Sequence, residues 1–153
     1  MVLYLVQHGK SLSKDVDSEK GLSQEGISEV QRIAEVAKGY HVKPTVICHS
    51  GKKRARQTAE IFFDALSPSE PLLQMDGIKP LDDVTVFAKK LEVDQKLMLV
   101  GHLPFMERLC SFLITGNIEP PVFKFQNGGI VCVERFSETD TWAIRWTLMP
   151  TIA

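Results

Sequence analysis

Val2-Leu-Tyr-Leu-Val-Gln-His-Gly9 begins the chain with an apolar run that ends at a histidine and a glycine. The stretch Val2–Val6 is short, apolar and stopped by Gly9, which predicts a buried strand. Two later segments repeat the pattern: Thr45–Cys48 precedes Ser50-Gly-Lys-Lys-Arg-Ala-Arg-Gln-Thr58, and Lys96–Val100 precedes Gly101-His-Leu-Pro104. Because a helix is expected after each of them, these units predict a sheet whose strands are mainly parallel.

The helices are predicted from apolar residues at helical spacing. Ser23 is placed to cap the first helix, which is expected to run to Lys38 with Gly39 as its C-cap. Its apolar residues recur at spacings of three and four: Ile27, Val30, Ile33, Ala34 and Ala37. Three further helices are expected over Ala55–Leu66, Val84–Leu91 and Phe105–Ile114. Asp82 or Asp83 is placed to cap the second of these, and the third begins after Pro104 and ends at Gly116.

The remaining segments predict further strands. Pro71–Met75 is expected to form a short strand, and the polar stretch Lys10–Lys20 a loop. Ile130–Phe136 and Trp142–Leu148 are rich in β-forming residues and are joined by a polar turn, Ser137–Asp140, which predicts an antiparallel hairpin. We therefore expect residues 1–153 to form one α/β domain of three layers, α/β/α, with a mainly parallel sheet and an antiparallel C-terminal hairpin.

Composition excludes several classes of protein. Hydrophobic residues make up 44% and charged residues 24% of the 153 residues, as in ordinary globular proteins, and the net charge of −1 gives no reason to expect a nucleic-acid or membrane partner. The opening apolar run lacks a basic leader and is too short for a signal peptide, and no stretch approaches the length of a membrane span. Three scattered cysteines do not suggest a disulfide framework. A cytoplasmic protein is expected.

Two histidines and an arginine follow the predicted strands. The carboxyl ends of parallel strands meet at one edge of a sheet, so His8, Arg54 and His102 are expected to lie close together. His8 can attack phosphorus through one ring nitrogen while a hydrogen bond to the other fixes its tautomer. Arg54 offers a planar fork to phosphate oxygens, and His102 can donate a proton or a hydrogen bond. Taken singly, a histidine at a strand end is more often a polar turn residue, which is our interpretation of His41 and His49.

Three sequence blocks carry a resemblance to a known family. They are Gln7-His8-Gly9 followed by Lys10-Ser11; Ser50, Arg54, Ala55, Gln57 and Thr58 in the pattern Ser-x3-Arg-Ala-x-Gln-Thr; and Gly101, His102 and Pro104 in the pattern Gly-His-x-Pro. Together they resemble the histidine phosphatase (phosphoglycerate-mutase-like) superfamily, and within it the short SixA-type phosphohistidine phosphatases. The resemblance runs to the end of the chain, where Trp146, Leu148 and Pro150 look like the family's closing strand.

The resemblance implies a phosphatase with a covalent phosphohistidine intermediate. In it, His8 is the nucleophile, Arg54 binds phosphate, His102 completes the pocket, and Gln7 and Ser50 line it. Neither a metal nor a cofactor is implied. The implied substrate is a phosphohistidine on a protein, such as a histidine-phosphotransfer domain, or a small phosphomonoester. No oligomeric state is predicted.

Gln7 departs from the family pattern, which places arginine before the histidine. A neutral amide replaces a charge-assisted hydrogen bond worth about 1.5–3 kcal/mol. A catalytically weakened module that binds phosphate or a phosphoprotein is therefore an alternative to an active phosphatase, unless Lys10 or Lys52 supplies the charge. Asp82 and Asp83 match a family Pro-x-x-Asp segment (Pro80–Asp83), but helix capping is the favoured interpretation.

Cys48 and Arg54 offer a further alternative. Five residues separate them, the spacing of cysteine-dependent phosphatases, in which a thiolate attacks phosphorus. Against this hypothesis, Ile47 precedes the cysteine, and Ala55 stands where that family usually has serine or threonine. The same hypothesis leaves His8 and His102 without a role.

Overall fold

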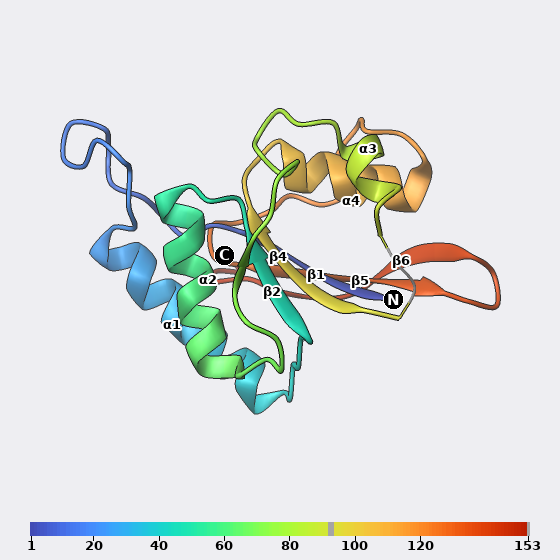
Figure 1. Cartoon of the computed structure of the whole chain (residues 1–153), viewed down its shortest axis with the longest axis horizontal. Helices are drawn as coiled ribbons and strands as arrows, with labels where there is room; N and C mark the ends of the chain where they lie inside the picture. The colour runs from blue at the N-terminus through green and yellow to red at the C-terminus, as the bar shows by residue number, and fades with distance from the viewer. Residues whose placement is uncertain (92–93, 153) are drawn as a thin grey trace.

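The sheet has six strands in the order β3-β2-β4-β1-β5-β6 in a computed structural model that describes residues 1–91 and 94–152. Figure 1 shows helices on both faces of this sheet. The elements in chain order are β1 (Val2–Gln7), α1 (Gln24–Gly39), β2 (Val46–His49), α2 (Lys53–Leu66), β3 (Leu73–Gln74), α3 (Val84–Ala88), β4 (Lys96–Gly101), α4 (Phe105–Thr115), β5 (Ile130–Phe136) and β6 (Thr141–Leu148).

The centre of the sheet is parallel and one side is antiparallel. β1 and β2 both pair in parallel with β4, whereas β5 runs antiparallel to β1 and continues through a hairpin into β6. The predicted α/β/α architecture, with a mainly parallel sheet and an antiparallel C-terminal hairpin, is therefore confirmed. β1 and β4 are almost entirely buried because helices cover both of their faces, as expected for parallel strands.

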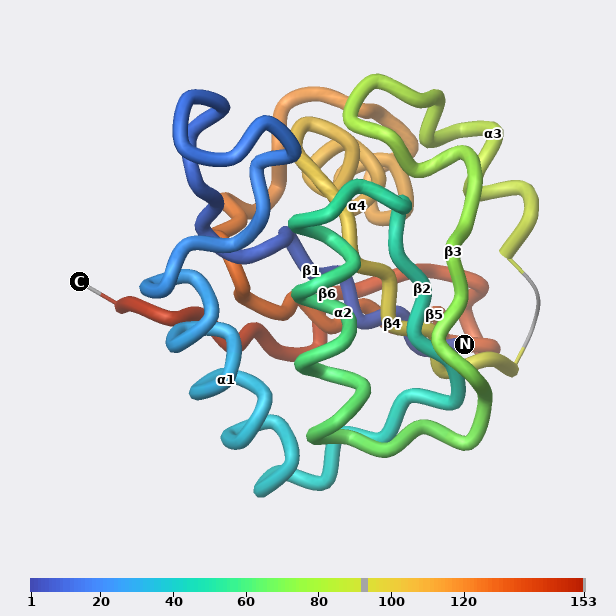
Figure 2. Tube along the Cα trace, turned by 60° about the vertical axis from the view of Figure 1, so that its left-hand side comes forward, coloured from blue at the N-terminus to red at the C-terminus, as the bar shows by residue number. Residues whose placement is uncertain are grey.

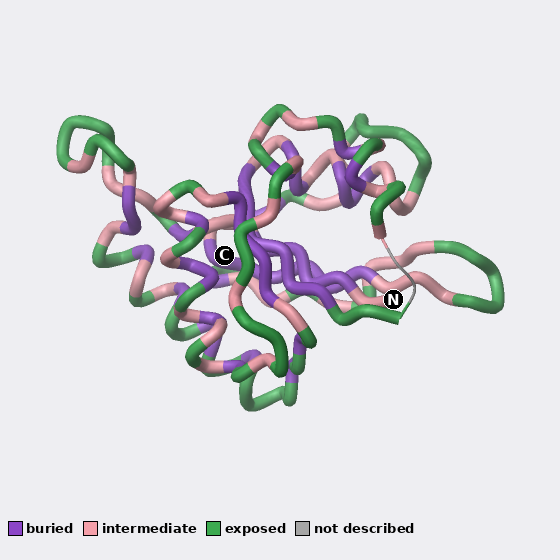
Figure 3. Tube along the Cα trace, in the orientation of Figure 1, coloured by how far each residue is buried: buried purple, intermediate pink, exposed green. Residues whose placement is uncertain are grey.

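Two apolar cores lie on opposite faces of the sheet. α1 and α2 pack against one face, and α3 and α4 lie over the other (Figure 1). The first core contains Val30, Ile33, Ala34 and Ala37 of the predicted apolar stripe of α1, packed with Phe62 of α2, whereas Ile27 is half-buried and lies outside this core. The second contains Phe105 and Leu109 of α4. Figure 3 shows the buried positions concentrated along the central strands. The two layers of helices fix the strands whose ends carry the candidate site.

Most predicted elements are present, with different ends. The strand expected over Pro71–Met75 has only two residues, Leu73–Gln74, and the helix expected over Val84–Leu91 ends at Ala88. Ser23 caps α1 as predicted. Gly39 as the C-cap is wrong: the glycine is the last helical residue, Tyr40 is the cap, and the left-handed backbone conformation falls on His41, with φ of +60°. A tight turn still follows the helix, one residue later than predicted.

No helix in the described part of the chain is both long enough and apolar enough to cross a membrane.

Candidate active site

The carboxyl ends of β1, β2 and β4 bring together residues that are far apart in sequence. The backbone N–H of His8 donates a hydrogen bond to the carbonyl of Gly101 at 2.9 Å, which joins the ends of β1 and β4. His8 and His102 lie with ring centroids 5.1 Å apart. Arg54, in the first turn of α2, lies with its Nε 3.3 Å from Nε2 of His8. The two histidines and the arginine therefore form one cluster.

The hydrogen bonds of His8 define its tautomer. Nδ1 lies 2.7 Å from the backbone carbonyl of Gly9, which can only accept, so Nδ1 carries the proton. Nε2 then holds the lone pair, to which Arg54 donates its Nε–H. A histidine held in this way presents an unprotonated nitrogen with a fixed direction, as a nucleophile requires.

The turn after β1 is packed against α2. The N–H of Gly9 donates to Oγ1 of Thr58 at 2.9 Å, and the Thr58 hydroxyl donates to the carbonyl of Arg54 at 2.8 Å. A Cβ at Gly9 would lie 2.7 Å from Cγ2 of Val30, closer than such contacts occur, so only glycine allows this approach. Thr58 thus links the backbone beside His8 to the helix that carries Arg54.

Ser50 holds the second histidine. Its Oγ lies 2.6 Å from Nε2 of His102, and both residues are buried. Nδ1 of His102 is also buried and has no hydrogen-bond partner among the described residues. Buried polar atoms are nearly always paired, so this nitrogen is the atom that a bound oxyanion can satisfy when Nδ1 carries the proton.

Burial keeps both histidines neutral. It lowers the pKa of His8 to about 4, an effect opposed by the hydrogen bond to Gly9 and reinforced by the charge of Arg54. Burial is also the main cause that lowers the pKa of His102 to about 3, and electrostatic interactions with the neighbouring His8 and Arg54 lower it further. At neutral pH, Arg54 is consequently the permanent positive charge within the cluster.

Gln7 lies at the end of β1, opposite Gly101 of β4. Its side-chain oxygen is buried and lacks a hydrogen-bond partner among the described residues. Lys10 does not approach it, because its ammonium group pairs with Glu25 at 2.7 Å and Glu29 at 3.2 Å on α1. The charge of Lys52, by contrast, acts on His102 and lowers the pKa of that histidine.

Asn127 contacts the candidate site and was missed by the sequence analysis. Its side-chain N–H donates to the carbonyl of His8 at 2.9 Å, and the next N–H, of Gly128, donates to the carbonyl of Gln7 at 2.8 Å. The sequence signal is Asn127-Gly-Gly129 directly before β5, a turn that favours left-handed backbone; Gly128 has φ of +78°. This turn fixes the end of β1 from the side opposite β4.

Other candidates from the sequence lie outside the cluster or have structural roles. Asp83 caps α3 by accepting from the N–H of Thr85 at 2.8 Å, so capping is confirmed for this residue. Asp82 accepts from the N–H of Lys79. His49 accepts from the N–H of Gly51 within its turn.

Cys48 points into the core under α3 and α4, and burial raises its pKa to about 11. A thiol in such an environment is protonated at neutral pH and inert. These features argue against a thiolate nucleophile.

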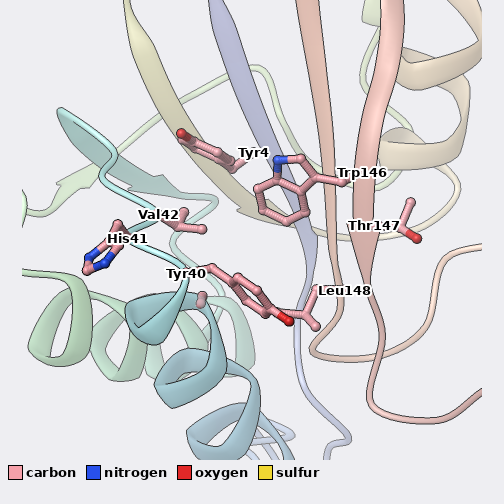
Figure 4. Close-up of a pocket in the computed structure, with 8 residues that line it drawn as sticks. Tyr4, Tyr40, His41, Val42, Trp146, Thr147 and Leu148 are labelled. Carbon is pink, nitrogen blue, oxygen red and sulfur yellow. The ribbon is translucent and has the colours of Figure 1, made fainter.

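No group of three or more histidine, cysteine, aspartate or glutamate side chains is placed to hold a metal ion within residues 1–91 and 94–152. A separate hollow of about 470 Å³ lies between the end of α1 and the last strand (Figure 4). Its walls are mainly apolar and aromatic, with Tyr4, Tyr40 and Trp146 around it, and it includes none of the clustered residues. Phosphoryl chemistry is better served by the cluster at the strand ends.

The geometry defines an α/β protein with two neutral histidines and an arginine at the carboxyl edge of its sheet. Residues 3–82, a little more than half of the chain, match the model of the histidine phosphatase superfamily, branch 1. The chain therefore belongs to the histidine phosphatase superfamily. The matched region includes His8 and Arg54, whereas His102 lies beyond it. None of the curated proteins matches the chain.

Solved structures support the same assignment. The chain is similar to the protein histidine phosphatase SixA complexed with tungstate, with 26% identity, a TM-score of 0.83, and 98% of this chain and 97% of that chain covered. The SixA protein from Agrobacterium tumefaciens has 23% identity and a TM-score of 0.77, with 97% of each chain covered. A phosphoserine phosphatase from Entamoeba histolytica has 14% identity and a TM-score of 0.70, with 96% of each chain covered. The resemblance predicted from the sequence blocks is confirmed.

Proposed function

We propose that this protein is a phosphatase that hydrolyses phosphohistidine on a protein, or a small phosphomonoester, through a covalent intermediate on His8. The observation that carries the proposal is the lone pair on Nε2 of His8, fixed by the Gly9 carbonyl and adjacent to the guanidinium of Arg54. A nucleophile beside a phosphate-binding fork is the minimum that phosphoryl transfer requires.

In the first step, Nε2 of His8 attacks phosphorus, a new N–P bond forms, and the bond from phosphorus to the leaving group breaks. Arg54 gives up its one hydrogen bond to His8 and donates to the phosphoryl oxygens instead. Nδ1–H of His102 donates to another oxygen while the Ser50 hydroxyl donates to Nε2 of His102. In the second step, water attacks phosphorus, the bond to His8 breaks, and inorganic phosphate leaves. After the first step, the ring of His8 carries the phosphoryl group on Nε2 and a proton on Nδ1, so it is a positively charged imidazolium. Breaking the N–P bond in the second step returns the neutral imidazole.

Phosphohistidine suits this site better than an ester. No carboxyl group of the described residues interacts with His8 or His102, and both imidazoles are neutral at pH 7. An alkoxide leaving group needs a proton from an acid. A phosphohistidine whose second ring nitrogen is protonated leaves instead as neutral imidazole, so it needs no acid from the enzyme.

Gln7 supports a second candidate, a module that binds a phosphorylated group with little turnover. Its buried amide oxygen has no described partner, and an amide lacks the positive charge of the family arginine. We favour the active enzyme because His8, Arg54 and His102 lie in one cluster, as the proposed reaction requires.

In the proposed function, the substrate is a phosphorylated protein, such as a histidine-phosphotransfer domain, or a small phosphorylated molecule. We propose that the reaction takes place in the cytoplasm. The proposed enzyme works as one domain without metal or cofactor.

Rapid-quench labelling tests the proposed function. A radiolabelled phosphodonor is mixed with the wild type, and the protein is assayed for an acid-labile, base-stable phosphoenzyme. We expect a label that is lost in His8→Ala and retained in Cys48→Ala, together with release of phosphate from the wild type. A label that survives in His8→Ala would remove this histidine as the nucleophile.

A further inference from the structure

A hollow lined by lysines adjoins the candidate active site. It has a volume of about 710 Å³ and shares Arg54 with the cluster. One carboxylate and five cations line it: Glu19, Lys14, Lys20, Lys52, Lys53 and Arg54. The net charge of the whole chain is only −1, so this concentration of positive charge is local. Figure 2 shows the loop of residues 10–20, in dark blue, beside the start of α2.

Three of these lysines have no ionic partner among the residues that the structure describes. Lys53 is neutralised by Asp17 at 2.8 Å and Glu19 at 3.8 Å. The ammonium groups of Lys14, Lys20 and Lys52, by contrast, form no hydrogen bond or ion pair with any residue in the described ranges. Unpaired cations gathered around one hollow repel each other, and an anion placed among them relieves that repulsion.

The loop that carries two of the lysines is held in place. The carboxylate of Asp17 accepts from the N–H of Glu19 and the N–H of Gly21, each at 3.0 Å, and from Nζ of Lys53 on α2. The N–H of Leu22 donates to the side chain of Gln57 on α2 at 2.7 Å. The lysines are therefore presented by a loop that is already organised before a ligand arrives, which reduces the entropy lost on binding.

The hollow adjoins the candidate active site through Arg54, and its charges act on both histidines. Burial is the main cause that lowers the pKa of His8, and the charges of Arg54 and Lys20 lower it further; the charge of Lys52 acts in the same direction on His102. Lys14 and Lys52 are exposed, so a protein surface can reach them while its modified side chain enters the cluster.

We propose that the surface formed by Lys14, Lys20 and Lys52, here called the lysine rim, binds acidic side chains that flank the phosphohistidine of a protein substrate. The proposal rests on the proposed function and names its substrate class. Lysine suits this role because its flexible side chain carries a point charge that can pair with carboxylates in several positions, whereas arginine favours one bidentate geometry. The volume exceeds what a phosphoryl group alone needs.

Binding is measured by fluorescence anisotropy with two labelled peptides of equal length. Both carry a non-hydrolysable triazole phosphonate analogue of phosphohistidine, flanked in one peptide by aspartate and glutamate and in the other by asparagine and glutamine. The proteins are the wild type, the triple variant Lys14→Gln/Lys20→Gln/Lys52→Gln, and Lys43→Gln. Lys43 is an exposed lysine before β2, at the opposite end of the sheet, and serves as the matched control.

The wild type is expected to bind the acidic peptide roughly tenfold more tightly than the neutral one at low salt, since three exposed ion pairs each add a modest gain in affinity. The triple variant loses this preference and Lys43→Gln retains it. The preference of the wild type also falls as salt rises toward 1 M, a readout that does not depend on any variant.

Equal binding of the two peptides by the wild type at low salt would overturn the lysine rim, and so would an acidic preference that survives in the triple variant. Turnover is measured separately, on the same peptides with authentic phosphohistidine. If the wild type prefers the acidic analogue but hydrolyses neither authentic peptide, the proposed function fails while the docking surface stands.

Discussion

Replacing Gln7 with arginine tests how much activity the neutral amide costs. Gln7 is a good position for this change because its backbone is held independently of its side chain, by pairing with Gly101 and by the N–H of Gly128. The side-chain oxygen has no described partner, so its removal breaks no described hydrogen bond. Gln7→Arg adds a guanidinium beside the phosphoryl position without disturbing the end of β1.

The size of the effect follows from the hydrogen bond that is restored. A bond from a charged donor contributes about 1.5–3 kcal/mol. If it strengthens in the transition state, kcat/KM rises roughly ten- to a hundredfold. If it is equally strong in the bound substrate, KM and the inhibition constant of phosphate fall instead while kcat is unchanged.

The assay compares kcat, KM and inhibition by tungstate for the wild type, Gln7→Arg, Gln7→Lys and Gln7→Met. We expect the arginine variant to gain most and the lysine variant less, because lysine supplies charge without a planar fork. Gln7→Met, which supplies neither, controls for the change in shape. If Gln7→Arg alters neither turnover nor the affinity for phosphate and tungstate, the arrangement of groups around the phosphoryl position described above is wrong.

Three further predictions concern acid, the Thr58 link and the thiol. The pKa of His8 in the folded protein is about 4, below its usual value of 6.5, so the unfolded chain takes up the proton first as the pH falls. The contribution of His8 to the free energy of unfolding is therefore fully present above pH 6.5 and is lost as the pH falls toward 4. Urea unfolding at a series of pH values is expected to show that this residue lowers the free energy of unfolding by an amount on the order of 3 kcal/mol over that range. Added phosphate is expected to restore part of the loss. A free energy of unfolding that does not change with pH would mean that His8 is not buried in its neutral form. Thr58→Val leaves the N–H of Gly9 without its acceptor and is expected to cost about 1–3 kcal/mol in the free energy of unfolding and to lower kcat, whereas Thr58→Ser keeps most activity. Cys48→Ala is expected to retain full kcat, and a loss of more than about tenfold would revive the thiolate hypothesis.

The sequence predicted the architecture and the clustering of the three main candidate residues because these depend on strong local signals. Apolar runs stopped by glycine marked β1 and β4, and Ser23 marked the start of α1. The parallel order of the strands then required His8 and His102 to share an edge of the sheet.

Contacts between distant segments were not predictable in the same way. The hydrogen bond from Asn127 to the carbonyl of His8 joins residues 119 positions apart, and nothing near His8 in the sequence points to it. The pairing of Lys10 with Glu25 depends on how the loop returns to α1. The end of α1 was also missed by one residue, because helix C-caps depend on packing as well as on the presence of glycine.

The place of β1 in the sheet has a consequence for synthesis on the ribosome. β1 lies between β4 and β5, so the strand that leads into His8 acquires its neighbours only after residues 96–101 and 130–136 have been translated. A nascent chain that has emerged only as far as α2 already contains both His8 and Arg54, but neither β4 nor β5, the two strands that pair with β1. We therefore expect the proposed chemistry to be switched off until translation has passed residue 136.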